Sequence, residues 1–171
     1  MTKRSLLVVV GLLSLVGCAA PTPPDYAAQH QPAIDAFMAG WNDGNIDGLD
    51  AAVAASFQRR SPGGLNSDGL AAFKKVVTDF RTSWPDANVV LDESHFMKDL
   101  SFHLWTFTGT NTGPGVMPPT GKSTKVSGST LIRYQDGKIV EELVYFDALD
   151  WRTQMGFTLT PPASGEAPAA Q

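Results

Sequence analysis

WTFTGTNTGPGVMPPTGK, at residues 105–122, decides the fold of this chain together with the segments that follow it. Alternating apolar and polar residues enter a turn rich in Gly and Pro, and a second alternating segment, TLIRYQDGKIVEE at 130–142, returns from it. The QDGK sequence at 135–138 is typical of a two-residue hairpin turn. A third alternating segment ends in VYFD at 144–147. These segments predict three consecutive antiparallel strands.

Helical periodicity takes the place of this alternation in the first half of the chain. Pro32 suits a first helical turn, and apolar residues recur at helical spacing as far as Trp41. A short second helix is expected at 46–55, and Ser67 is expected to cap a third helix that ends at Trp84. Strands are expected at 89–91, 100–110, 123–134 and 139–146, and a final helix at 149–155. Helices followed by an antiparallel meander predict an α+β fold.

The length of 171 residues accommodates one domain with additional segments at both ends. The hydrophobic share of 43% is that of an ordinary globular chain. Four parts are expected along the chain: a signal peptide at 1–17, a flexible Pro-rich tether at 18–31, a folded domain at 32–160, and a disordered tail of low complexity at 161–171.

The first part is typical of a bacterial lipoprotein signal peptide. Lys3 and Arg4 precede an apolar run from Leu6 to Val16, which is too short for a permanent transmembrane helix. The run ends in LVGC, which resembles a lipobox, so Cys18 is the expected site of lipid attachment. We therefore expect an exported protein anchored to an envelope membrane through Cys18, on the periplasmic side of the outer membrane in a Gram-negative cell. A plain signal peptide that ends near a cysteine is the alternative.

Charge and composition argue against several kinds of partner. The formal net charge is −4, and removal of Lys3 and Arg4 with the leader makes the rest of the chain more acidic. The sequence has no run rich in Lys and Arg, so nucleic acid is not an expected partner. The histidines His30, His95 and His103 lack the spacing of metal ligands, and we expect neither a metal site nor a cofactor.

The segments at 105–122, 130–142 and 144–147 together resemble the SnoaL-like polyketide cyclases, or ester cyclases, of the NTF2-like superfamily. The resemblance extends over about residues 34–157. It implies a cone in which a curved antiparallel sheet wraps around helices and leaves an open mouth. It also implies a cofactor-independent reaction on a small apolar carbonyl compound, and a homodimer formed through the exposed face of the sheet.

Asp147 is the expected catalytic residue. Strict alternation places Leu143, Tyr145 and Asp147 on one face of the last strand, and Val144 and Phe146 on the other. The resemblance implies that an Asp at the end of this strand moves a proton at a carbon next to a carbonyl group. Burial in an apolar cavity would raise the pKa of such a carboxyl toward the working pH. The alternative is an Asp that caps the following helix or simply ends the strand.

Six further residues are expected to line a substrate pocket: Trp41, Gln58, His103, Trp105, Asn111 and Tyr145. Trp41 belongs to the first helix, which closes the cone in the family that the chain resembles. For His103, a hydrogen-bonded core position is the alternative that a lone His among aromatic residues favours. Asn111 lies where cyclases of this group commonly carry His, and Gln58 belongs, with Arg59 and Arg60, to the stretch where they often carry a His-Asp pair. Both departures remove titratable side chains.

Arg59 and Arg60 are neighbours, so at most one of them faces a pocket if they belong to a strand. An inward guanidinium group can bind a carboxylate or a phosphate of a ligand. The alternative, which the sequence alone favours, is an ordinary solvated pair on the surface.

Two hypotheses of function remain open at this point. The first is an enzyme that acts on a small apolar carbonyl compound, with Asp147 as the proton-transfer group and with Asn111, Gln58 or His103 orienting the carbonyl oxygen. The second is a non-catalytic module of the cell envelope that binds a hydrophobic ligand or another protein. The missing His positions and the expected export favour the second.

Replacement of the expected lipid-attachment residue tests the anchor. Cys18→Ser removes the thiol that would carry the lipid, and burial of acyl chains contributes about 0.8 kcal/mol per CH₂ group. We expect the variant to move from the membrane fraction to the soluble fraction on centrifugation of lysed cells. Persistence of the variant in the membrane fraction would contradict lipid attachment at Cys18.

Overall fold

The computed structural model describes residues 24–115 and 118–161. The expected signal peptide, Cys18 and nearly all of the expected tail lie outside the described residues. No helix within the described ranges combines the length and the apolar character needed to cross a membrane.

The described residues contain the predicted helices and the four predicted strands in the expected order, together with two strands, β1 and β2, that were not predicted. In chain order they are α1 (Tyr26–Asp43), α2 (Leu49–Ala52), β1 (Val53–Arg60), β2 (Ser67–Asp68), α3 (Leu70–Ser83), β3 (Asn88–Phe96), β4 (Leu100–Thr110), β5 (Ser123–Gln135), β6 (Lys138–Phe146) and α4 (Ala148–Gln154).

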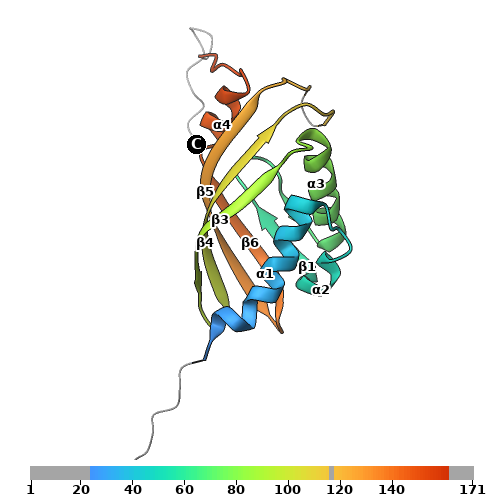
Figure 1. The fold of residues 1–171 in the computed structure, drawn as a ribbon, viewed down its shortest axis with the longest axis vertical. Helices are drawn as coiled ribbons and strands as arrows, with labels where there is room; N and C mark the ends of the chain where they lie inside the picture. Colours follow the sequence, from blue (N-terminus) through green and yellow to red (C-terminus); the bar gives the residue numbers. More distant parts are fainter. Residues whose placement is uncertain (1–23, 116–117, 162–171) are drawn as a thin grey trace, which may run out of the picture.

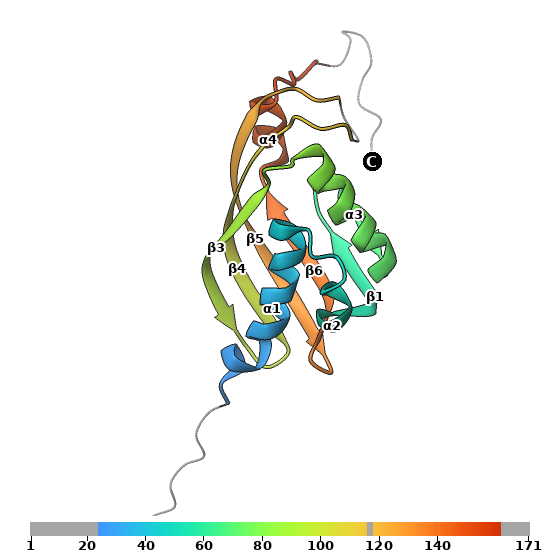
Figure 2. The ribbon, with the colours of Figure 1, turned by 45° about the vertical axis from the view of Figure 1, so that its right-hand side comes forward.

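The strands form one sheet in the order β2-β1-β6-β5-β4-β3. Strands β3 to β6 pair antiparallel, whereas β1 pairs parallel with β6 and antiparallel with β2. Figures 1 and 2 show a strongly curved sheet with α1 and α3 on one side of it and α4 at the end of the molecule opposite the start of α1. The predicted α+β fold, with helices packed on a curved antiparallel sheet, is confirmed.

Aromatic side chains form much of the core between the helices and β1. Phe37 on α1 stacks on Phe73 of α3, with ring centroids 5.2 Å apart. Phe57 of β1 packs against Phe73 at 4.7 Å, and Trp41 meets Phe80 edge-on at 5.5 Å. Large rings at helical spacing on α1 and α3 therefore hold both helices against the sheet.

Helix α1 begins earlier than predicted, so residues 26–31 belong to a helix and not to the tether. The side chain of Asp25 caps the helix by accepting a hydrogen bond from the backbone N–H of Ala28 at 2.9 Å. Pro32 consequently lies inside α1. His30 provides the tertiary contact, because its ring stacks on Tyr134 at 3.8 Å and its Nε2–H donates to the Lys98 carbonyl at 2.9 Å.

The segment between α1 and α3 also differs from the prediction. The expected helix at 46–55 ends at Ala52, because Val53 and Phe57 are buried on one face of β1. Ser67 does not cap α3 but pairs with Arg59 in the ladder of β1 and β2, and Gly69 precedes the helix. Long-range pairing with β6 overrides the local helical preference here.

The two-residue turn predicted between β5 and β6 is confirmed. Asp136 and Gly137 have φ values of 51° and 76°, which are the left-handed conformations that a turn of this kind requires at both central positions. The observed β4 has the predicted bounds, and β5 and β6 differ from theirs by one residue.

A β-bulge in β6 decides which side chains face the helices. Arg133 pairs with Glu141 whereas Tyr134 pairs with Ile139, so Val140 is an extra residue without a partner in the ladder. Ile139 is fully buried, and the next fully inward side chain is Glu142 and not Glu141. The bulge thus exchanges the two faces for the remainder of the strand, because side chains alternate with a period of two.

The early start of α1 can be tested by removing the ring of His30. His30→Ala deletes a side chain that is 1% exposed, and we expect the free energy of unfolding to fall by about 2 kcal/mol or more in urea denaturation. Gln29→Ala, which changes an exposed neighbour in the same turn, should alter it by less than about 0.5 kcal/mol. Equal, small effects of both changes would mean that α1 starts beyond His30.

Candidate functional site

A chamber of about 100 Å³ lies between α1, α3 and the concave face of the sheet. Its wall is mostly aromatic and aliphatic, and both Trp41 and Trp105 belong to it, as predicted. The aromatic residues of the wall are Phe37, Trp41, Phe80, Trp105, Phe107, Phe146 and Trp151. Such a wall favours a small, largely apolar ligand.

Five polar side chains interrupt this wall: Arg59, Ser61, His103, Thr130 and Glu142. Arg59 comes from β1 and Glu142 from β6, and the parallel pairing of these strands places them directly side by side. Within the described wall, they are the basic and the acidic side chain that together form an ion pair. The chamber therefore contains one cation and one anion in apolar surroundings.

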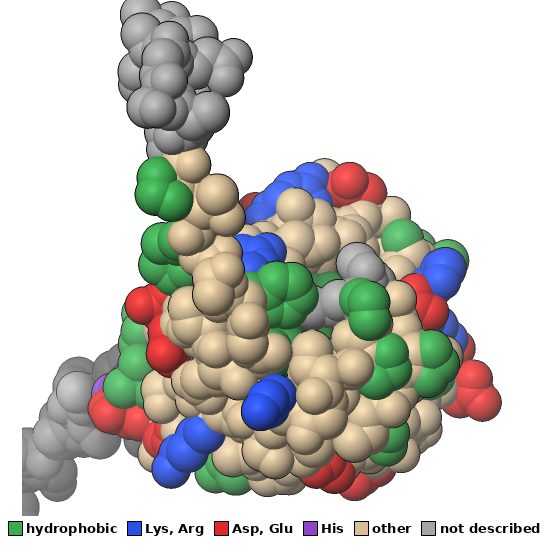
Figure 3. Space-filling model, turned by 90° about the horizontal axis from the view of Figure 1, so that it is seen from above, with side chains coloured by type: hydrophobic (Ala, Val, Ile, Leu, Met, Phe, Trp, Pro, Cys, Tyr) green, Lys and Arg blue, Asp and Glu red, His purple; other side chains and the backbone are tan. Residues whose placement is uncertain are grey.

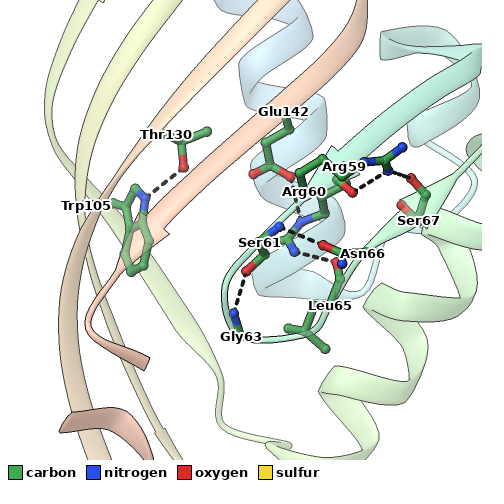
Figure 4. A network of polar contacts seen from close by, with 10 residues as sticks. All are labelled: Arg59, Arg60, Ser61, Gly63, Leu65, Asn66, Ser67, Trp105, Thr130 and Glu142. Carbon is green, nitrogen blue, oxygen red and sulfur yellow. Dashed lines mark hydrogen bonds and ion pairs between the residues drawn. The ribbon is translucent and has the colours of Figure 1, made fainter. Parts of the chain in front are cut away.

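Arg59 and Glu142 form a buried ion pair. Nε of Arg59 lies 2.7 Å from Oε2 of Glu142, and the two residues are 6% and 4% exposed. The N–H bond is not directed at the oxygen, so this short contact lacks the geometry of a good hydrogen bond. Figure 4 shows the two side chains facing each other beside the loop at residues 61–66.

Two further contacts hold the guanidinium group of Arg59 in place. Nη1 donates to the carbonyl oxygen of Leu65 at 2.6 Å, and the guanidinium carbon lies 5.2 Å from the ring centroid of Trp41. The position of Arg59 therefore does not depend on Glu142 alone. Arg60 points the other way and pairs with Asp68, so the prediction that at most one of the two faces inward is confirmed.

The pKa of Glu142 is raised. Burial is the main cause, because removal from water disfavours the charged carboxylate, and the neighbouring Arg59 opposes this effect by attraction. A carboxylate whose pKa is raised in this way is a stronger base than an exposed one, which suits general acid-base chemistry.

Trp105 forms a rigid part of the chamber wall. Its Nε1–H donates to Oγ1 of Thr130 at 2.8 Å, so the indole is fixed across the neighbouring strand (Figure 4). Gly128 makes room for it, since a Cβ atom at this position would lie 2.4 Å from the ring. The hydroxyl oxygen of Thr130 therefore accepts a hydrogen bond from another residue of the wall.

His103 belongs to the chamber wall, but both of its ring nitrogen atoms lie within hydrogen-bond distance of neighbouring hydroxyl groups. Its Nδ1 lies 2.8 Å from Oγ of Ser94, and its Nε2 lies 2.7 Å from Oγ of Ser101, which in turn bonds to the hydroxyl of Tyr134. Burial, with a smaller contribution from His95, lowers the pKa of His103 to about 4. The ring is therefore neutral at pH 7, and its role is to complete a polar network at the wall.

The prediction that Asp147 projects into the chamber is wrong. Asp147 is exposed and does not contact the chamber, and its Oδ1 accepts hydrogen bonds from the backbone N–H groups of Leu149 and Asp150 at 2.9 and 2.8 Å. It is the N-cap of α4, which was the alternative. The bulge at Val140 explains the error, because strict alternation from Ile139 assigns the wrong face.

Three other expected pocket residues also lie elsewhere. Gln58 is exposed because Arg59 takes the inward position on β1. Tyr145 is 59% exposed on the outer face of β6, beside a shallow groove. Asn111 is fully buried, but it joins a loop to the end of α3: Nδ2 donates to the Ser83 carbonyl at 3.2 Å, and Oδ1 accepts from the Thr120 N–H at 2.9 Å.

Sequence reasoning missed Glu142 and interpreted Arg59 as a surface residue. The signal for Arg59 was its place two residues after Phe57, on the face of β1 that carries a large apolar ring. Adjacent glutamates, Glu141 and Glu142, offered no signal, since only the bulge decides which of them enters the chamber. Among the described residues, no group of three His, Cys, Asp or Glu side chains is arranged to hold a metal ion.

Apolar side chains gather at the end of the molecule that carries α4 (Figure 3). Leu149, Phe157 and Leu159 are exposed there. Leu65 and Phe146 are half-buried and belong to the chamber wall, and the tip of the loop at 61–66 contacts the ring of Phe146 near Gly63. This loop therefore contributes Ser61 and Leu65 to the chamber wall.

A double-mutant cycle tests the buried ion pair. We expect Arg59→Met and Glu142→Leu each to lower the free energy of unfolding by about 3 to 5 kcal/mol, and the double variant to recover most or all of this loss. Arg59→Met leaves Glu142 with a pKa raised by burial, so its stability should be greatest at low pH and should fall as pH rises through that pKa. Urea unfolding at several pH values measures all of these quantities, and additive losses would exclude a coupled pair.

The comparisons with known proteins agree with this architecture. The chain superposes on a protein from Jannaschia sp. CCS1 that is described as a SnoaL-like polyketide cyclase. The TM-score is 0.70 at 20% sequence identity, and the superposition covers 80% of this chain and 97% of that chain. A protein of ketosteroid isomerase-like fold from Catenulispora acidiphila, in complex with trimethylamine, gives a TM-score of 0.63 at 17% identity, with 75% and 97% covered. TerC, co-crystallised with polyporic acid, gives 0.61 at 17% identity, with 74% and 98% covered.

These identities are low, so the structural neighbours show a shared fold and no more. No curated protein matches the chain. The family model of the SnoaL-like polyketide cyclases matches residues 31–155, a range that includes every residue of the described chamber wall. The chain therefore belongs to the SnoaL-like polyketide cyclase family.

Proposed function

We propose that this protein binds a small, largely apolar carbonyl compound in its chamber and moves a proton of that compound through Glu142. One observation carries the proposal: a carboxyl group, 4% exposed and held beside a fixed guanidinium group, in a wall otherwise made mainly of aromatic and aliphatic side chains. Membership of the cyclase family supports the same class of chemistry. Glu142 takes the role that the family resemblance had implied for Asp147.

The proposed reaction needs only the residues of the wall. The carboxylate of Glu142 accepts a proton from a carbon next to the carbonyl group, and the electron pair moves onto the carbonyl oxygen. The guanidinium group of Arg59 stabilises that oxyanion. The enolate carbon then attacks a second carbonyl group of the same molecule, and the resulting alkoxide takes the proton back from Glu142. The product is a ring-closed isomer, and no oxidant or other reactant is consumed.

Glu142 and Arg59 suit these steps for electrostatic reasons. The raised pKa of Glu142 makes its carboxylate a stronger base than an exposed one. Arg59 remains charged throughout, because a guanidinium group does not lose its proton in proteins. The wall around Arg59 is mainly apolar, so the attraction between Arg59 and an oxyanion is stronger than it would be on the surface.

A non-catalytic binding protein is the second candidate, and one observation favours it. His103, the second titratable side chain of the described wall, has both ring nitrogen atoms within hydrogen-bond distance of serine hydroxyl groups. The described wall then offers Glu142 no uncommitted histidine as a second general acid or base. In that case Arg59 and Glu142 orient a ligand by its polar group, and the chamber stores or presents that ligand unchanged.

The setting of this activity is also part of the proposal. An exported protein, lipid-anchored through Cys18, would present the chamber outside the cytoplasm, and the Cys18→Ser fractionation tests that location. A homodimer through the outer face of the sheet is supported by the exposed apolar side chains of Leu104 and Tyr145, which are 39% and 59% exposed.

Hydrogen-deuterium exchange of a simple ketone tests proton transfer without knowledge of the natural substrate. We expect the protein to accelerate the loss of the α-hydrogen NMR signal of 2-indanone in deuterated buffer. Glu142→Gln should reduce this acceleration by about a hundredfold or more, because it removes the base. Glu142→Asp keeps a carboxylate and should retain part of it.

Asp147→Asn is the matched control, since it changes an exposed carboxylate at the end of the same strand and should leave the exchange rate unchanged. Circular dichroism of each variant verifies that it is folded. If 2-indanone binds, as detected by changes in its NMR line width, but does not exchange faster, the binding protein is the correct alternative. If Asp147→Asn abolishes the exchange and Glu142→Gln does not, Glu142 is not the base.

A further inference from the structure

We infer that the chamber takes apolar monocarboxylic acids by an exchange of ion-pair partners, in which the carboxylate of the ligand replaces Glu142 on Arg59 while Glu142 takes up one proton. This inference rests on the proposed function, because it assigns a class of ligand to the same chamber. It goes further in stating what the ligand carries and what binding does to the protonation of the protein.

The geometry of Arg59 favours such an exchange. A guanidinium group binds a carboxylate best through two parallel hydrogen bonds, and one edge suited to this consists of Nε and Nη2. In Arg59, Nη1 is committed to the Leu65 carbonyl, Nε makes the single, poorly directed contact with Glu142, and Nη2 has no acceptor among the described residues. Glu142 therefore leaves this edge only partly used.

Arg59 also keeps its place when its partner leaves. The Leu65 carbonyl at 2.6 Å and the face of Trp41, whose ring centroid is 5.2 Å from the guanidinium carbon, hold the group independently of Glu142. An entering carboxylate thus meets a cation that is already oriented, and binding requires little additional ordering.

Charge balance determines the proton uptake. The described wall carries one positive and one negative side chain, so an added carboxylate would leave an unbalanced anion in an apolar chamber. Protonation of Glu142 restores neutrality at once, and burial already raises the pKa of this side chain. The other titratable side chain that faces the chamber, His103, has a pKa of about 4 and stays neutral above pH 6.

The volume of the chamber limits the size of the apolar part of the ligand. A cavity of about 100 Å³ is of the order of engineered protein cavities of about 150 Å³ that bind benzene. Aromatic side chains such as Phe37, Trp41 and Trp105 surround this space. The ligand class is therefore a carboxylic acid on a single aromatic ring or an aliphatic group of similar volume.

Benzoic acid and acetophenone form a matched pair of probes for this inference. They share the phenyl ring and the carbonyl group, but only benzoic acid ionises. We would measure the dissociation constant of each from tryptophan fluorescence or ligand NMR at several pH values between about 6 and 8, where a carboxylic acid is ionised in solution. Benzoate should bind more weakly as pH rises, approaching tenfold per pH unit for uptake of one proton. Acetophenone binding should not change with pH.

Substitution of Glu142 gives the decisive second measurement. Glu142→Gln leaves Arg59 without a competing carboxylate, so benzoate should bind with an affinity independent of pH, and at least tenfold more tightly than to the unmodified protein at about pH 8. Asp147→Asn should show the pH dependence of the unmodified protein. If Glu142→Gln does not fold, the comparison of the two probes on the unmodified protein still decides the question.

The outcomes separate the inference from the proposed function. If acetophenone binds and benzoate does not, or if benzoate binding shows no dependence on pH, partner exchange is overturned while the chamber remains a site for carbonyl compounds. If neither probe binds, the chamber as a ligand site fails. If Glu142→Gln weakens benzoate binding, Glu142 is an attractive contact of the acid and not its competitor.

Discussion

Burial of the ion pair between Arg59 and Glu142 is the constraint on which the site depends. Two charges in an apolar wall are tolerated only together, since either one alone would carry a desolvation penalty of several kcal/mol. The pair can form because β1 runs parallel to β6 and places Arg59 opposite Glu142. The chamber that accommodates this pair is mainly apolar, and the pair is the one place in its described wall where an acidic and a basic side chain meet.

The same pair links the sheet to the loop at 61–66. Arg59 contacts Glu142 with Nε and the carbonyl of Leu65 with Nη1. This one side chain therefore joins β6 to the loop at 61–66. The loop itself is held by the N–H of Ser61, which donates to Oδ1 of Asn66 at 2.7 Å. A ligand that changes the partner of Arg59 acts on a group that also positions this loop.

The remaining polar side chains of the chamber stabilise the wall more than they offer chemistry. Thr130 fixes the indole of Trp105, and His103 is bonded to two serine hydroxyl groups. Satisfied hydrogen bonds of this kind keep buried polar groups compatible with an apolar core. The chemistry that the chamber can perform is therefore concentrated on one carboxyl group, which agrees with a cofactor-independent proton transfer or with recognition of a single polar group.

The sequence by itself determined the fold class, the strand that carries His103 and Trp105, and the two-residue turn at Asp136 and Gly137. These features follow from local patterns, namely alternation, helical spacing and turn chemistry, which act over a few residues. The folded protein retains these features because its strand pairing and packing are compatible with the local patterns.

Only the tertiary structure decided which carboxyl group enters the chamber. An unpaired residue at Val140 exchanges the faces of β6, so Glu142 points inward and Asp147 becomes the cap of α4. Parallel pairing with β1, between segments about eighty residues apart, then supplies Arg59 as its partner. Bulges and strand pairing depend on packing against distant parts of the chain, and no local pattern near Glu141 and Glu142 records them.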